Sequence, residues 1–318
     1  MKHFINALLA SLLLLSAIPA RAAVLADRDT STMVFVNIPV AHIRHSPAHS
    51  SEMVTQALLG TPVCVTDTVG EWFGVTLPDS YTGFINSSSV TNVSAEDFAA
   101  WKKSPRVIVN CPATVDVVAD TIKGGRVTYL MNGTILPAAV TPGSNYLYVS
   151  LPDSTAGYIP TDMAMRLSEA FTPFADTDLV IATASLANGA PYLWGGTTLL
   201  APDCSGLVRR AYFAAGILLP RDASQQALVG IDIPVSRPDL WKRGDLLFFT
   251  NEAGTKITHV AIYDRRGRFI HSSGKVFIAS IDPADPLYIP RKVVQVVRVA
   301  GCEDTPGIIR LTSHPWYF

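Results

Sequence analysis

The stretch Pro191–Val208, PYLWGGTTLLAPDCSGLV, decides how the rest of this chain is interpreted. After Cys204, apolar residues recur at helical spacing as far as Ala215, which predicts a helix. Asp203 is a typical N-cap residue, and Gly216 is a typical helix stop. Cys204 therefore falls in the first helical turn, where free N–H groups and the helix dipole favour a thiolate over a thiol. We interpret Cys204 as a candidate nucleophile.

Two histidines follow in strand-like segments, His259 in HVAIYD and His271 in RFIHSS. The short polar segment 264–267 between them predicts a hairpin, which places the two histidines side by side. A cysteine, a histidine base and a third, orienting group form the arrangement of a nucleophilic enzyme. Tyr192 and Trp194 precede Cys204 and are followed by two glycines. An aromatic, glycine-rich segment of this kind is typical of the lining of a substrate cleft. The alternative is that Cys204 is only a small buried apolar residue.

The first residues predict export. Lys2 precedes an apolar run, Ala7–Ile18, that is too short to span a bilayer. Ala20-Arg21-Ala22 fits a cleavage site, so we expect a signal peptide at 1–22 and a periplasmic or extracellular mature chain without a membrane span. An N-terminal anchor is the less favoured alternative. The chain of 318 residues has a net charge of -1, and no basic excess points to nucleic acid.

The four cysteines give no sign of a metal centre. Cys64, Cys111, Cys204 and Cys302 are widely spaced and lack the paired pattern of a zinc site, so we expect neither metal nor cofactor. If Cys204 stays free as a nucleophile, at most one disulfide can form among the other three. The sequence does not favour any particular pair.

An internal repeat organises the N-terminal half. Val75–Ile85 reads VTLPDSYTGFI, and Val149–Ile159 reads VSLPDSTAGYI, 74 residues later. Two tandem copies of one small β-barrel, at 33–93 and 105–168, explain this match, with a helical linker at 94–104. In the first copy we expect strands at 33–38, 62–67, 72–77 and 83–86. Only the first copy has Glu52 and Tyr81 in its loops, which indicates that the first copy has a binding role. The alternative is that both are surface residues that vary freely and have no function.

The third unit, 175–318, has helices first and antiparallel strands afterwards, an α+β layout. We expect helices at 178–188 and 223–229, strands at 246–250 and 293–299, and irregular structure after Ala300.

The strings YLWGG, DCSGLV, PRDASQQ, RGDLLFF, HVAIYD and FIHSS, within 178–299, resemble the NlpC-type cysteine peptidases of bacterial cell-wall metabolism. The two repeats resemble bacterial SH3-like domains. The whole arrangement resembles the γ-D-glutamyl-L-diamino acid endopeptidases, or dipeptidyl-peptidase VI. The resemblance implies a papain-like catalytic domain preceded by two SH3-like β-barrels.

The resemblance also implies a role for each matched residue. Cys204 is the nucleophile, His259 the base and His271 its orienting group, while Tyr192 contributes to the oxyanion hole. The residues that line the substrate pocket are Trp194, Asp203, Ser205 and Asp222, and those that bind the free amine of an N-terminal L-Ala are Glu52 and Tyr81. Asp222 could instead serve only as a helix cap. Ala223 departs from relatives that have Ser there, and the neighbouring Ser224 could replace the lost contact.

The function that follows is hydrolysis of the γ-D-Glu–diamino acid bond in murein stem peptides, with a preference for free peptides that begin with L-Ala. An N-acetylmuramoyl-L-alanine amidase, a murein hydrolase acting on intact peptidoglycan, and a non-catalytic wall-binding protein are the alternatives. The sequence leaves open whether the diamino acid is diaminopimelate or Lys. We expect a monomer whose partner is the murein peptide.

Overall fold

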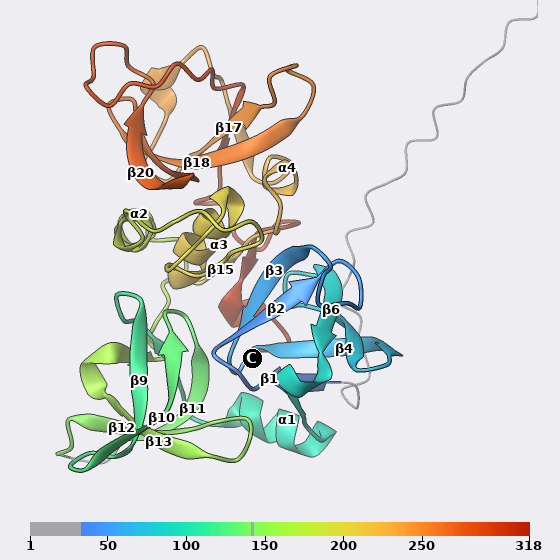
Figure 1. Ribbon diagram of the computed structural model, residues 1–318. Coiled ribbons are helices and arrows are strands. Elements are labelled where there is room, and N and C mark those ends of the chain that lie inside the picture. The colour runs from blue at the N-terminus through green and yellow to red at the C-terminus, as the bar shows by residue number, and fades with distance from the viewer. Residues whose placement is uncertain (1–32, 141–142) are drawn as a thin grey trace, which may run out of the picture.

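The computed structural model describes residues 33–140 and 143–318, so the expected signal peptide lies outside the described residues. Figure 1 shows two sheets below and a third above, with helices between them. We call residues 33–93 the first unit, 105–168 the second unit and 175–318 the catalytic unit. No helix among the described residues is long and apolar enough to cross a membrane.

The first unit is a seven-stranded antiparallel sheet in the order β3-β2-β6-β5-β4-β1-β7. Its strands are β1 (Met33–Val36), β2 (Val40–Arg44), β3 (Met53–Leu58), β4 (Pro62–Val69), β5 (Trp72–Thr76), β6 (Thr82–Asn86) and β7 (Val90–Asn92). The four expected strands correspond to β1, β4, β5 and β6, whereas β2, β3 and β7 were not predicted. The loop between β2 and β3 carries Glu52, and the β5–β6 turn carries Tyr81.

The second unit repeats this strand order one for one, as β10-β9-β13-β12-β11-β8-β14. Its strands are β8 (Arg106–Val109), β9 (Thr114–Asp120), β10 (Gly124–Met131), β11 (Ile135–Val140), β12 (Tyr146–Ser150), β13 (Ala156–Pro160) and β14 (Ala164–Arg166). The shared topology supports the predicted duplication.

The repeated LPDS…G motif has a physical reason. Ser80 and Ser154 both adopt positive φ, at 66° and 68°, in the turn that each copy makes after its Pro-Asp pair. A Cβ on Gly83 would lie 2.5 Å from Ile43, and one on Gly157 would lie 2.5 Å from Val117. The same turn and the same close strand approach therefore preserve the same residues in both units.

Helix α1 (Ala95–Lys103) joins the two units, as the linker prediction required. Ser94 caps it by accepting a hydrogen bond from the Asp97 N–H. Its buried side chains, Phe98 and Trp101, enter a core that also contains Met33 of the first unit and Ile108 of the second.

The catalytic unit places helices against one face of a six-stranded antiparallel sheet. The helices are α2 (Thr177–Leu186), α3 (Cys204–Ala214) and the short α4 (Ala223–Gln226). The sheet order is β16 (Ile231–Ile233), β21 (Gln295–Arg298), β17 (Leu246–Thr250), β18 (Ile257–Arg265), β19 (Arg268–Ser273) and β20 (Lys275–Ser280). Helix α4 is shorter than expected, and the predicted last strand narrows to β21.

The C-terminal segment after Ala300 is mostly irregular, as predicted, but several of its side chains are buried. β22 (Ile309–Arg310) pairs with β15 (Ile217–Leu218). Leu311, Trp316 and Tyr317 then join the core shared with α1 and both N-terminal units. In Figure 1 the C-terminus accordingly lies beside β1. This cluster therefore contains residues of all three units and of α1.

Candidate active site

Cys204 begins helix α3, and Asp203 is its N-cap, as predicted. The Asp203 Oδ1 atom accepts a hydrogen bond of 2.7 Å from the Gly206 N–H. Helix α3 approaches the preceding loop so closely that a Cβ on Gly206 would lie 2.0 Å from the Gly196 carbonyl oxygen. Glycine at position 206 therefore fixes the position of Cys204.

The thiol is not the preformed thiolate that the helix terminus suggested. Burial, and secondarily the Asp203 carboxylate, raise the pKa of Cys204 to about 11. Hydrogen bonds from the backbone of Val260 and Ser205 act in the opposite direction, but burial outweighs them. The free enzyme therefore holds a neutral thiol at neutral pH. Slow alkylation at that pH would not distinguish an enzyme from a wall-binding protein.

The two histidines meet across the β18–β19 hairpin, as predicted. The His259 Nε2 and His271 Nδ1 atoms are 2.8 Å apart. Burial lowers the pKa of His259 to about 3, with His271 as the next cause, and burial lowers the pKa of His271 to about 4. Both rings are neutral at pH 7. Because Nε2 of His259 faces His271, its Nδ1 is the nitrogen left to accept a proton.

Asp203 has a second role that was not predicted from the sequence. Besides capping α3, it forms a buried ion pair with Arg221. The Arg221 Nη2 atom lies 2.5 Å from Asp203 Oδ2, and both side chains are more than nine-tenths buried. Arg221 also donates to the Ser205 hydroxyl at 2.8 Å and to Thr55 Oγ1, in the first unit, at 3.0 Å. The loop that precedes Cys204 is therefore tied to the first unit.

A cleft of about 510 Å³ opens in front of Cys204. Of the ten residues expected at the site, the eight that line the cleft are Glu52, Tyr81, Tyr192, Trp194, Asp203, Cys204, Ser205 and Asp222. His259 and His271 are buried behind them. Lys256 also lines the cleft. Within residues 33–140 and 143–318 there is no cluster of three side chains suited to hold a metal ion.

The first unit reaches this cleft through two contacts. Trp194 Nε1 donates to Glu52 Oε1 at 2.6 Å. The Tyr81 hydroxyl lies 3.4 and 3.5 Å from the two Asp222 carboxylate oxygens. Burial and the Asp222 charge raise the pKa of Tyr81 to about 12, and burial also raises the pKa of Asp222. Glu52, Asp203 and Asp222 therefore bring three carboxylates to the lining of the cleft.

Sequence reasoning missed Arg221, Thr55 and Gln56. Gln56 Oε1 accepts a 2.9 Å hydrogen bond from the Thr197 N–H. Arg221 stands in the PRDASQQ string, but its partners lie 18 and 166 residues away, so no local pattern identifies it. All four cysteines are buried, and none of them forms a disulfide bond within the described residues.

Comparison with known proteins identifies two matching domain families. The model of the NlpC/P60 family matches residues 189–298, and that of the bacterial dipeptidyl-peptidase Sh3 domain matches residues 43–90. A gamma-D-glutamyl-L-lysine dipeptidyl-peptidase of Bacillus cereus is 30% identical over 234 residues, which cover 70% of this chain and 68% of that protein. The chain belongs to the NlpC/P60 family. It is a cysteine peptidase.

Two further proteins are similar to this chain over more than the catalytic unit. Dipeptidyl-peptidase 6 of Lysinibacillus sphaericus is 28% identical over 78% of this chain and 92% of its own length. The crystal structure of an NlpC/P60 family protein from Bacillus cereus superposes with a TM-score of 0.72 at 24% identity, over 84% of this chain and 99% of that one. The latter likeness shows a shared fold that extends beyond the catalytic unit.

Proposed function

We propose that this chain hydrolyses the γ-D-Glu–diamino acid bond of murein peptides through Cys204, and that it prefers free peptides that begin with L-Ala. The proposal rests on the cleft, which Cys204 lines together with the carboxylates of Glu52 and Asp222. We infer that the Trp194–Glu52 and Tyr81–Asp222 contacts close one end of this cleft, which we call the closed end. The similarity to the gamma-D-glutamyl-L-lysine dipeptidyl-peptidase of Bacillus cereus supports this bond. In this proposal the second unit is a further SH3-like domain.

The chemistry begins with a neutral Cys–His pair. As the sulfur attacks the carbonyl carbon, its proton passes to Nδ1 of His259, which then gives a proton to the leaving amine. In the tautomer that leaves Nδ1 free to accept a proton, Nε2 of His259 carries the hydrogen and donates it to Nδ1 of His271, which holds the imidazole in place. Tyr192 and the Cys204 N–H stabilise the oxyanion, and burial raises the pKa of Tyr192, so its hydroxyl stays a donor. Water then hydrolyses the thioester.

The closed end sets the choice of substrate. A free ammonium group can pair there with Glu52 and with the Tyr81–Asp222 pair, whereas a glycan joined to the L-Ala nitrogen has neither the charge nor the space. An unpaired charge in a partly desolvated site costs several kcal/mol. Recycling or turnover of released wall peptides is therefore the expected role.

Cleavage-site mapping by mass spectrometry tests the reaction. The wild type and Cys204→Ala would be incubated side by side with L-Ala-γ-D-Glu-diaminopimelate, its Lys counterpart and intact sacculi. We expect cleavage after D-Glu by the wild type only, fastest on a free peptide. Release of L-Ala from muramic acid would identify an amidase instead. Equal hydrolysis by Cys204→Ala would contradict the proposed nucleophile.

N-acetylation of the peptide tests the closed end separately. We expect kcat/KM to fall roughly a hundredfold or more on the acetylated peptide. Glu52→Gln should slow only the free peptide and so narrow this difference. Glu71→Gln, on an exposed carboxylate of the same unit that pairs with His49, is the matched control. Equal cleavage of both peptides by the wild type would make the first unit a tether to the wall.

A further inference from the structure

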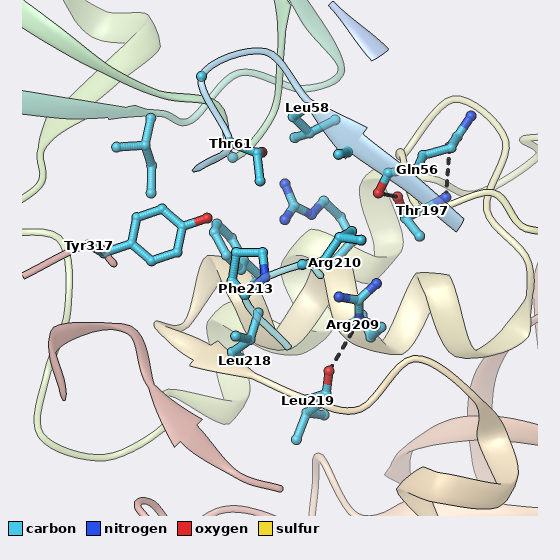
Figure 2. Close-up of a pocket in the computed structure, with 16 residues that line it drawn as sticks. Gln56, Leu58, Thr61, Thr197, Arg209, Arg210, Phe213, Leu218, Leu219 and Tyr317 are labelled. Carbon is cyan, nitrogen blue, oxygen red and sulfur yellow. Dashed lines mark hydrogen bonds between the residues drawn. The ribbon is translucent and has the colours of Figure 1, made fainter. Parts of the chain in front are cut away.

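A second cavity lies away from Cys204, at the place where the three units meet (Figure 2). Its volume is about 60 Å³. Its lining includes Gln56 and Thr61 from the first unit, Gly133 from the second unit, and Arg210 and Tyr317 from the catalytic unit. No Asp or Glu is among the lining residues.

Arg210 contributes a buried cation to this cavity. It is only 8% exposed, and its Nη1 donates to the Asn132 carbonyl oxygen of the second unit at 2.6 Å. Its guanidinium stacks on Phe213 at 4.5 Å, and its Nε has no hydrogen-bond partner among the described residues. A Cβ on Gly133 would lie 1.8 Å from Nη1, so only glycine leaves room for this guanidinium.

The charge of Arg210 is not balanced by the protein. The neighbouring Arg209 forms a buried ion pair with Asp79, but no carboxylate of the described residues pairs with Arg210. Burial and then Arg209 lower the pKa of Arg210 to about 10, which still leaves it charged at pH 7. Tyr317 cannot supply the missing charge, since burial raises the pKa of its phenol and keeps it protonated. Its hydroxyl points toward the guanidinium in Figure 2.

We propose that this cavity binds a small inorganic anion of the chloride class, held by Arg210 and the Tyr317 hydroxyl. A buried charge is stable only when it is paired, and the protein offers donors but no acceptor charge here. A water needs roughly 10–15 Å³ of such volume, so the cavity has room for one small anion with water but not for an organic acid. The anion neutralises Arg210 where the first and second units meet the catalytic unit. It thereby stabilises the packing that holds Glu52 and Tyr81 over the cleft.

Thermal unfolding of the full chain tests this site. Sodium chloride would be exchanged for sodium gluconate at constant ionic strength, because gluconate is too large for the cavity. We expect the wild-type Tm to rise by roughly 3 °C as chloride replaces gluconate, as mass action requires for an anion that binds only the folded state. An equal Tm in both salts would overturn the proposal.

A variant and a direct probe complete the test. Arg210→Met keeps an apolar stem on Phe213 but removes the charge, so its Tm should no longer depend on chloride. Arg126→Met removes an exposed ion pair with Asp116 and should keep the wild-type dependence. Should Arg210→Met fail to fold, bromide-soaked crystals of the wild type decide the question. An anomalous peak beside Arg210 supports the site, and its absence, with water in the cavity instead, overturns it.

Discussion

The neutral state of Cys204 has a kinetic consequence that can be measured without any substrate. Because its pKa is raised to about 11 and that of His259 is lowered to about 3, no thiolate–imidazolium pair forms near pH 7. The thiolate fraction, and with it the rate of alkylation by iodoacetamide, should rise about tenfold per pH unit from pH 6 to roughly pH 10. Peptide mapping would confirm Cys204 as the modified residue, with Cys204→Ala as the control. A rate that is level from pH 5 to 8 would instead show a preformed ion pair.

Arg221 is the residue whose loss should cost the most stability near the site. Arg221→Met leaves the Asp203 carboxylate buried without its partner, and we expect a loss of about 3–5 kcal/mol in the free energy of unfolding. Arg237→Met, which breaks the exposed pair with Asp239, should cost less than about 1 kcal/mol. Urea denaturation of both variants makes the comparison. Similar losses of unfolding free energy in the two variants would mean that burial of the Asp203–Arg221 pair contributes nothing to stability.

The sequence alone predicts where some site residues lie, but not how they are buried or with which residues they pair. The positions of Cys204, His259 and His271 follow from local patterns, namely a helix start and a hairpin. The pKa of Cys204 does not, because burial depends on how the whole unit packs. Arg221 was missed for the same reason, since its ion pair and its contact with Thr55 join distant segments.

At the scale of elements, helix α3 is placed by contact rather than by its own propensity. Gly206→Ala would push a Cβ against the Gly196 carbonyl oxygen and displace the first helical turn with Cys204. A shift of about 1 Å at a nucleophile costs on the order of a hundredfold in kcat/KM. Gly301→Ala, where a Cβ meets nothing within 4 Å although φ is +91°, should lower stability without lowering kcat/KM. Full activity of Gly206→Ala would refute this account of the helix position.

Elements were predicted where side chains alternate or caps are present, and missed elsewhere. Strand β17 and the β18–β19 hairpin have buried apolar runs beside polar turns, so their pattern is clear. Strand β2 alternates but is only five residues long, and strand β3 buries two polar side chains, Thr55 and Gln56, which breaks the expected alternation. Strand β3 pairs with β2, and β2 also pairs with β6, so sheet pairing rather than local pattern identifies these strands.

On the scale of the whole molecule, the shared core predicts cooperative unfolding. Trp316 packs into the cluster that α1 and both N-terminal units share. We expect a single calorimetric transition for the wild type. Trp316→Ala should cost about 3–5 kcal/mol and separate an earlier transition of the first unit. Tyr148→Ala, at a residue that is 40% exposed, should keep one transition. A single, unshifted transition in Trp316→Ala would show that the units are coupled elsewhere.

The contact between Trp194 and Glu52 also gives the molecule an optical reporter. Of the five tryptophans, Trp194 is 62% exposed, whereas the other four are at most 9% exposed. Acrylamide should therefore quench the fluorescence of Trp194 selectively. A peptide ammonium group that takes Glu52 from the indole N–H would shift this emission and shield the ring. Occupancy of the closed end can thus be followed in real time, in Cys204→Ala, with no label attached.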